Sequence, residues 1–286
     1  MTIETDTYNF TMSIKNFIDK HFPNVARNYR FFRDRRVYAR RRMRSTNLGF
    51  DFIGVEGIAD SRSSTGELKL LQELLLATDV FVDVGANCGL FASVACKAGV
   101  RTLAFEPNLE NYKLLLQNLH HNKFTKVEAF LVALSNRSGV LPLFGGGEGA
   151  SLEANGGGMA STYSSLVSVN TLDSLVGTRF LQERLLIKVD VEGHEFDVLH
   201  GATGLLKRCP APVWLLEHGF TENFAGKINP HFQELFELFW RGGYVCFTAD
   251  NERRRVLRED VSRWFAQGVR DFGYLNYMFI KDSTSG

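Results

Sequence analysis

Acidic, amide and glycine residues alternate in one short stretch of the chain, at Asp83, Gly85, Asn87 and Gly89. Apolar and β-branched residues lead into this stretch and a helix-length apolar run follows it, which predicts a strand, a tight turn and a helix in succession. Such a turn brings backbone N–H groups and a helix N-terminus to one point above the edge of a sheet. We therefore expect a nucleotide cofactor to bind here.

The spacing of this turn distinguishes between cofactors. The G-x-G-x-x-G pattern that binds a pyrophosphate is absent, and the carboxylate of Asp83 would repel one. An acid at that position suits the ammonium and sulfonium groups of S-adenosylmethionine. A second predicted strand, residues 101–105, ends in Glu106 and Pro107. A carboxylate at Glu106 can hold both ribose hydroxyls, and Pro107, which lacks an N–H, ends the strand.

A second group of side chains that could do chemistry follows two later strands. Residues 185–190 read as a buried parallel strand with Asp190 at its carboxyl end, and residues 212–216 as the next strand. The turns after these strands carry Glu192, His194, Glu217 and His218. Because open α/β sheets bind ligands at their carboxyl edge, we expect these groups to converge beside the cofactor and Asp190 to contact it.

Three assignments of the catalytic groups remain open. A hydroxyl acceptor needs a base, and histidine, with an ordinary pKa of about 6.5, is matched to neutral pH. His194 begins a predicted helix, whose dipole favours neutral imidazole, so Asp190 and His194 are the first choice as an acid–base pair. Glu217 and His218 are the second choice. The third is a divalent metal ion held by Asp190, Glu192 or Glu217, since carboxylate oxygens suit magnesium.

Several longer segments resemble the FkbM-type methyltransferases. They are VFVDVGANCGLFASVACKAG, TLAFEPNLENYKLLLQNLHHN, VNTLDSL, and LLIKVDVEGHEFDVLHGA followed by PVWLLEHG. The resemblance covers about residues 74–220, in the order of the family. It implies an S-adenosylmethionine-dependent enzyme of class I, most often an O-methyltransferase for a hydroxyl on a sugar, glycolipid or polyketide-like metabolite. The class I pattern also implies that the adenine lies beside Leu134 and Ser135.

The pattern of predicted elements favours one α/β domain over residues 48–286. Its sheet is expected to be Rossmann-like, with seven mostly parallel strands and helices on both faces. The strands at residues 244–248 and 271–280 are expected to form an antiparallel pair at its end. Residues 194–206 are expected to form one helix. The glycine- and serine-rich residues 145–165 predict a long loop, either a substrate lid or a disordered segment.

Residues 1–47 are expected to form a separate helical extension, basic and rich in aromatic residues. Residues 1–50 carry eleven Lys or Arg and four Asp or Glu side chains, a net charge of +7, most of it between Arg27 and Arg44. This segment could pack on the catalytic domain, or bind an anionic carrier or a membrane surface. No apolar run reaches the ~18 residues of a membrane span, and no secretory signal is evident. We therefore expect a cytoplasmic protein, peripheral to a membrane if the extension binds one.

Two other classes of function compete with methyl transfer. An NAD(P)-dependent oxidoreductase is disfavoured by the spacing of the glycine turn. A non-catalytic adaptor would retain the fold and use the basic extension to bind a partner. A nucleic acid acceptor is disfavoured because the chain has no Asn/Asp-Pro-Pro-Tyr motif. We therefore expect a small molecule or a glycan as the acceptor.

Overall fold

The computed structural model describes residues 41–54, 65–154, 164–224, 226–273 and 275–282. The predicted extension, residues 1–47, lies outside the described residues except for residues 41–47, and so does most of the Arg27–Arg44 segment. The described part opens with a short hairpin of β1 (Arg44–Ser45) and β2 (Asp51–Phe52). No helix within these described ranges is long and apolar enough to cross a membrane.

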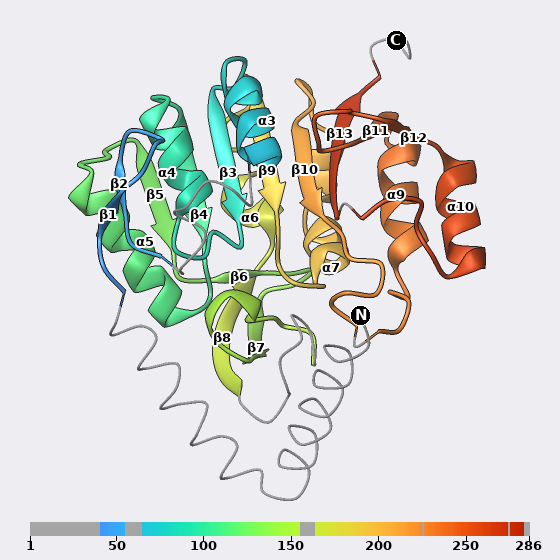
Figure 1. Cartoon of the computed structure of the whole chain (residues 1–286), viewed down its shortest axis with the longest axis horizontal. Coiled ribbons are helices and arrows are strands. Elements are labelled where there is room, and N and C mark those ends of the chain that lie inside the picture. Colours follow the sequence, from blue (N-terminus) through green and yellow to red (C-terminus); the bar gives the residue numbers. More distant parts are fainter. Residues whose placement is uncertain (1–40, 55–64, 155–163, 225, 274, 283–286) are drawn as a thin grey trace, which may run out of the picture.

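One large sheet forms the centre of the molecule (Figure 1), in the order β12-β11-β13-β10-β9-β3-β4-β5. The parallel strands are β3 (Val80–Val84), β4 (Arg101–Phe105), β5 (Val127–Phe130), β9 (Leu185–Val189) and β10 (Val213–Glu217). Between β10 and β11 (Tyr244–Thr248) runs the antiparallel β13 (Asn276–Lys281), and β12 (Arg255–Val256) extends the edge. The α/β fold with a mostly parallel sheet is confirmed. The sheet has eight strands rather than seven, because the short β12 adds one.

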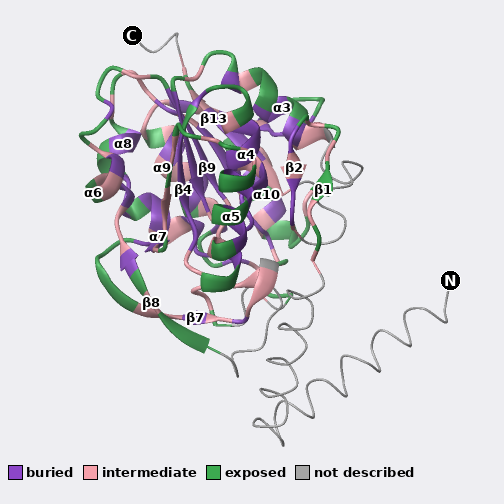
Figure 2. Cartoon of the chain, turned by 90° about the vertical axis from the view of Figure 1, so that its left-hand side faces the viewer, coloured by how far each residue is buried: buried purple, intermediate pink, exposed green. Residues whose placement is uncertain are grey.

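Alternate residues of the central strands enter two different apolar cores, as expected for a sheet covered on both faces. Val80, Val82 and Val84 pack in one core, and Phe81 packs in the other. The first core is closed by α6 (Leu172–Val176), α7 (Glu195–His200), α8 (Thr203–Leu206), α9 (Phe232–Arg241) and α10 (Arg258–Gln267). The opposite face is covered by α3 (Thr65–Leu75), α4 (Leu90–Lys97) and α5 (Leu109–His121). Figure 2 shows the buried strands between helices whose outer surfaces are exposed.

A second, three-stranded sheet lies at the lower end of the large sheet in Figure 1. Its order is β6 (Ala133–Leu134), β8 (Ser164–Asn170) and β7 (Gly139–Phe144). Pattern alone cannot separate β6 from β5, because only two residues lie between them. This sheet matters for function because β6 and the segment after β7 border the cavity described below.

Two expected elements differ from the structure. The single helix expected over residues 194–206 is two short helices, α7 and α8, on either side of Gly201. A Cβ at Gly201 would lie 2.0 Å from the carbonyl oxygen of Ser135, which directly follows β6. Only a residue without a side chain lets the two segments approach this closely. The last strand begins at Asn276 rather than at residue 271.

The loop expected over residues 145–165 is only partly within the described residues. Residues 147–149 form a 3₁₀ turn, and Ser151 forms a two-way backbone bridge with Phe144. Strand β8 already begins at Ser164, and residues 155–163 lie outside the described residues. The first part of the expected loop is therefore a packed segment.

Candidate active site

A cavity of about 280 Å³ opens at the carboxyl ends of β3, β4 and β9. Its lining includes residues 84–88 of the turn after β3, residues 105–107 after β4, and residues 190–192 after β9. Residues 132–134 and the segment after β7 complete the walls. This is the edge at which α/β sheets bind their ligands, so the two predicted groups of site residues meet at one place.

Two glycines allow the turn after β3 to pack closely against the neighbouring segments. Gly85 has a φ of +84°, and a Cβ on it would lie 1.8 Å from the carbonyl oxygen of Asp190. Gly89 also has a φ of +84°, and its Cβ would lie 2.3 Å from Leu115 Cδ1 on α5. Only glycine allows both the left-handed backbone and these approaches. Gly85 therefore lets the turn after β3 pack directly against the turn after β9. Gly89 lets the start of α4 pack against α5 and is not part of the described lining.

Glu106 connects the end of β4 to the turn after β3. Its carboxylate accepts the backbone N–H of Asn87 at 2.8 Å and that of Asn108 at 2.8 Å. Burial raises the pKa of Glu106 to about 7, although these hydrogen bonds act in the opposite direction. Glu106, Pro107 and Asn87 all line the cavity. The Glu106 side chain, which we predict to bind the ribose, is therefore buried, fixed by hydrogen bonds and part of the cavity wall.

Of the two residues predicted to lie beside the adenine, Leu134 lines the cavity and Ser135 does not belong to the described lining. Leu134 is buried and lines the cavity together with Phe105 and Leu143, which gives that end an apolar surface. Ser135 is buried but is not among the lining residues. Its hydroxyl instead lies 3.0 Å from His194 Nε2. Ser135 thus supports another side chain of the site.

Asp83 lies behind the cavity rather than in its described lining. Its register on β3 places it opposite Lys188 of β9. Burial raises the pKa of Asp83 to about 7, while the ammonium of Lys188 acts to lower it. Asp83 therefore belongs to a buried group of charges with Lys188 and Asp190. Its predicted contact with the methionyl end of a cofactor stays a prediction.

Lys188 is a residue of the cavity wall that sequence reasoning did not assign to the site. It lines the cavity, with its ammonium 2.7 Å from Asp190 Oδ2 and 4.4 Å from the centre of the Phe91 ring. Burial alone would lower the pKa of Lys188, but the surrounding carboxylates, Asp190 above all, raise it beyond its ordinary value. The available signal was a lysine inside an otherwise apolar strand, where only a paired charge is stable.

Three carboxylates gather at the carboxyl ends of β9 and β10. Asp190, Glu192 and Glu217 each offer an oxygen within 4.8 Å of the others, an arrangement that could hold a divalent cation. Asp190 and Glu192 line the cavity, and Glu217 does not belong to its described lining. The charge of Asp190, and burial after it, raise the pKa of Glu217 to about 9. Glu217 is therefore protonated at neutral pH in the absence of a cation.

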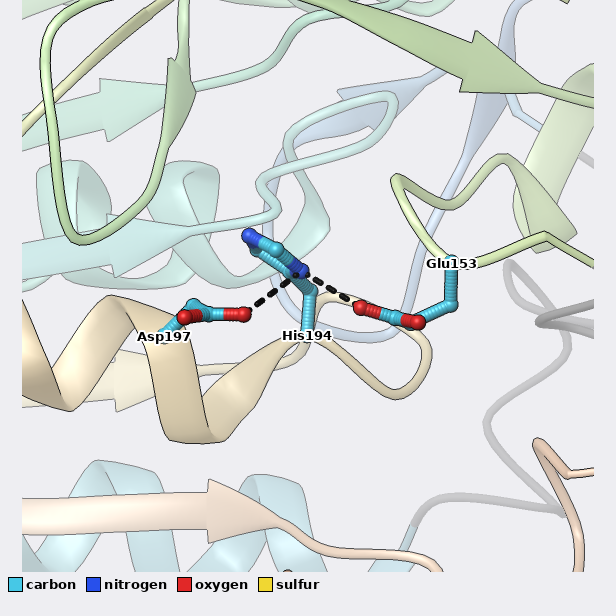
Figure 3. A group of neighbouring side chains, drawn as sticks. All are labelled: Glu153, His194 and Asp197. Carbon is cyan, nitrogen blue, oxygen red and sulfur yellow. Dashed lines mark hydrogen bonds and ion pairs between the residues drawn. The ribbon is translucent and has the colours of Figure 1, made fainter.

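His194 lines the cavity, and both nitrogens of its ring face polar groups. Figure 3 shows the two contacts of Nδ1, with Glu153 and Asp197. Nδ1 lies 2.8 Å from Glu153 Oε1 and 3.5 Å from Asp197 Oδ2, and Nε2 faces the Ser135 hydroxyl. The structure thus brings Asp190 and His194 to the same cavity, but it gives His194 three other partners. Glu153 is a second residue that sequence reasoning missed, because it lies in a stretch that reads as a loop.

His218 lies away from the cavity. It is 1% exposed, stacks on Phe232 with 5.1 Å between ring centres, and its Nε2 faces the Phe232 carbonyl oxygen at 3.3 Å. Neighbouring residues at the end of a strand point to opposite faces, so Glu217 and His218 diverge. The second predicted acid–base pair is therefore not assembled in the described structure.

Comparison with known proteins agrees with this geometry. The model of the family described as the methyltransferase FkbM domain matches residues 83–246, more than half of the chain. A hexuronic acid methyltransferase, AglP of Haloferax volcanii, is 34% identical over 152 residues, which are 52% of this chain and 61% of that protein. The chain thus matches less than two thirds of that relative's length.

Solved structures of methyltransferases also align with the chain. A TehB-like SAM-dependent methyltransferase from Corynebacterium glutamicum is 12% identical, with 76% of this chain and 88% of that one covered and a TM-score of 0.41. A precorrin-6y C5,15-methyltransferase from Geobacter metallireducens is 12% identical, with coverages of 80% and 95% and a TM-score of 0.42. The family match spans the glycine turn, Glu106, and both turns of the cavity, and by it the chain belongs to the FkbM methyltransferase family.

Proposed function

We propose that the protein transfers a methyl group from S-adenosylmethionine to a hydroxyl group of a sugar-like acceptor. The observation that supports it most is the cavity at the carboxyl edge of the sheet, which the glycine turn and Glu106 border within the matched family region. The relative named as a hexuronic acid methyltransferase favours a glycan or a small sugar as the acceptor over the other metabolite classes. An oxidoreductase and a non-catalytic adaptor are disfavoured by the same family match.

The described residues fit S-adenosylmethionine. Carboxylates suit a cofactor with an ammonium and a sulfonium group, and Asp190 and Glu192 both face the cavity. The buried carboxylate of Glu106 would hold the ribose, and Leu134 with Phe105 would enclose the adenine. The volume of about 280 Å³ lies just below the roughly 300–1,000 Å³ of typical small-molecule sites. When bound, the cofactor supplies an electrophilic methyl group.

Asp190 is the described side chain best placed to receive the acceptor's proton. It lies at the end of β9, lines the cavity, and retains partial exposure, with 26% of its side chain accessible. The ammonium of Lys188 fixes its carboxylate, and alignment of the acceptor with the methyl donor would provide most of the rate. His194 would assist from its position between Ser135 and Glu153. A divalent cation on Asp190, Glu192 and Glu217 is the alternative arrangement.

Binding measurements test the identity of the cofactor, and turnover measurements test the acceptor and the methyl transfer. Isothermal titration should show binding of S-adenosylhomocysteine and none of NADH; the reverse result would favour the oxidoreductase. Mass spectrometry of ligands that co-purify, followed by a screen of neutral and acidic sugars, should identify the acceptor. Absence of methyl transfer to every hydroxylated acceptor, with S-adenosylhomocysteine bound, would favour the adaptor.

Substitutions separate the two catalytic arrangements. Asp190→Asn should lower kcat by roughly 10²–10⁴, the usual contribution of a general base, and a chelator should leave the wild-type protein active. Loss of activity with chelator, restored by magnesium, would assign the three carboxylates to a cation. Full turnover in both Asp190→Ala and His194→Ala would refute the acid–base proposal.

A further inference from the structure

Residues 147–153, here called the covering segment, form one side of the cavity. Gly147, Ala150, Ser151 and Leu152 belong to its lining, together with the glycine turn and Glu106. The segment connects the side of α5 to the turn after β9, because its two ends contact these two elements. A cofactor in this cavity would therefore be enclosed between the cofactor-binding turns and the covering segment.

Two of the contacts that hold the covering segment are partly buried hydrogen bonds. At one end, the side-chain amide of Asn111 on α5 donates to the carbonyl oxygen of Gly147 at 2.8 Å. In the middle, the hydroxyl of Ser151 donates to the carbonyl oxygen of Glu192 at 2.8 Å and accepts the N–H of Glu153 at 3.0 Å. Ser151 is 1% exposed, so these bonds are shielded from water.

The third contact lies at the Glu153 end of the covering segment and joins two side chains, one of which is exposed. Glu153 places a carboxylate oxygen 2.8 Å from His194 Nδ1, and the two side chains point toward each other in Figure 3. Its aliphatic part packs against the backbone of the turn after β9, since a Cβ on Gly193 would lie 3.6 Å from Glu153 Cγ. The Glu153 side chain is 39% exposed and that of His194 only 7%. This contact therefore joins the edge of the covering segment to a side chain of the cavity wall.

We propose that Glu153 is a positioning residue that keeps the cofactor cavity closed, by anchoring the covering segment to His194. The bond holds residues 147–153 against the turn that carries Asp190 and Glu192, and its release lets the segment move away so that the cofactor exchanges. The proposal rests on the proposed function only in naming S-adenosylmethionine as the occupant. The closure itself is a property of the ligand-free chain.

A cation shared by Glu153, His194 and Asp197 is the competing explanation of this cluster, because their ligand atoms lie within 4.8 Å of one another. A direct N–H···O bond accounts for the 2.8 Å between His194 Nδ1 and Glu153 Oε1 without an ion. A chelator separates the two explanations, since it would open a cluster held by a cation and leave a hydrogen bond unchanged.

The first test is hydrogen exchange of the full chain without ligand. Glu153→Gln removes the charge and retains the shape of the side chain. The amides of Phe144 and Ser151, which bond to each other's carbonyl groups, should exchange about tenfold faster in this variant, because a hydrogen bond to a charged group is worth roughly that factor or more. Glu234→Gln is the matched control: it breaks a pair with the same 2.8 Å distance, to His231 Nδ1, at an exposed site on α9, and should leave these amides unchanged.

The second test measures the cofactor itself by stopped-flow. S-adenosylhomocysteine should dissociate from Glu153→Gln roughly three- to tenfold faster than from the wild type and from Glu234→Gln. In turnover, the KM for S-adenosylmethionine should rise in Glu153→Gln and not in Glu234→Gln; a general loss of folded protein would instead lower kcat at constant KM. If Glu153→Gln fails to fold, Ser151→Ala, which releases the middle of the segment, should show the same faster exchange and release.

Wild-type exchange and release rates in folded Glu153→Gln would overturn the proposal, and so would faster exchange of the wild type in the presence of a chelator. Failure of the wild type to bind S-adenosylhomocysteine would overturn the proposed function alone, because the exchange experiment reports closure without any ligand.

Discussion

At the level of single residues, Glu106 combines a buried charge with a predicted ligand role. Its carboxylate already accepts two backbone N–H groups and faces the cavity. Glu106→Ala would leave the ribose hydroxyls without an acceptor, at a cost of roughly 1–3 kcal/mol. Calorimetry should therefore show a loss of S-adenosylhomocysteine affinity of about tenfold or more. Glu110→Ala, a change at an exposed carboxylate in the first turn of α5, is the control, and equal affinities in both variants would reject the ribose assignment.

Glu217 gives a prediction about pH. Its folded-state pKa of about 9 lies above the ordinary value of 4.5. Between these values the unfolded chain has released the proton and the folded chain keeps it, so the folded state loses stability as the pH rises. Glu217→Gln keeps a neutral side chain at every pH. Its free energy of unfolding should thus increase relative to the wild type between pH 5 and pH 9.

Urea unfolding at pH 5 and at pH 8.5 measures this difference. Glu110→Gln is the control, because the Glu110 carboxylate is exposed on α5. Its free energy of unfolding should equal that of the wild type at both pH values. A constant difference between Glu217→Gln and the wild type across the pH range would show that Glu217 is ionised in the folded protein, as it would be beside a bound cation.

At the level of elements, the decisive contact is between the turn after β3 and the turn after β9. Gly85→Ala puts a Cβ 1.8 Å from the Asp190 carbonyl oxygen at a φ of +84°. Gly99→Ala imposes a similar φ of +81° with nothing within 4 Å, so it isolates the cost of the backbone conformation. We expect Gly99→Ala to lose about 1 kcal/mol and Gly85→Ala to lose more, on the order of 3 kcal/mol, together with cofactor binding.

Thermal unfolding and titration with S-adenosylhomocysteine check both changes. The comparison matters because β3 and β9 are also neighbours in the sheet, so displacement of one turn moves Asp190 relative to Asn87. Equal destabilisation by the two alanines, with cofactor affinity retained in both, would mean that the turns need not approach this closely.

At the level of the whole molecule, we expect the part of the basic extension before Arg41 to be dispensable for cofactor binding. The cavity is built from residues 52–194, and the Arg41 guanidinium contacts Cys88 Sγ, a lining residue, at 3.4 Å. We propose that a variant beginning at Arg41 keeps the cofactor affinity, because it retains this contact and the β1–β2 hairpin. If the removed arginines bind an anionic carrier or a membrane, the full chain should bind anionic vesicles at low salt and release them at high salt.

Vesicle co-sedimentation of the full chain and of the shortened variant measures this difference. The shortened variant should fail to sediment with anionic vesicles at any salt concentration. A shortened variant that folds but no longer binds S-adenosylhomocysteine would place the extension in the cofactor pocket.

Much of the site was predictable because it is encoded locally. The glycine turn, Glu106 at the end of one strand and Asp190 at the end of another follow from strand periodicity and from the rule that parallel strands share a carboxyl edge. The family resemblance of the same segments is confirmed by the match over residues 83–246. The two-faced core follows from the same local patterns, whereas the order of the strands depends on pairing between distant segments such as β3 and β9.

The rest depended on contacts between residues distant in the sequence. Successive residues of a strand point to opposite faces, so a shift of one position decides whether a polar side chain faces the cavity or the core. Lys188 lines the cavity, whereas His218 is buried in the core. The partners of His194 are Ser135 and Glu153, 59 and 41 residues away. Sequence by itself thus determined which chemistry the chain carries. Tertiary packing alone decided which of those side chains reach the cavity, because burial and pairing arise only when separate segments meet.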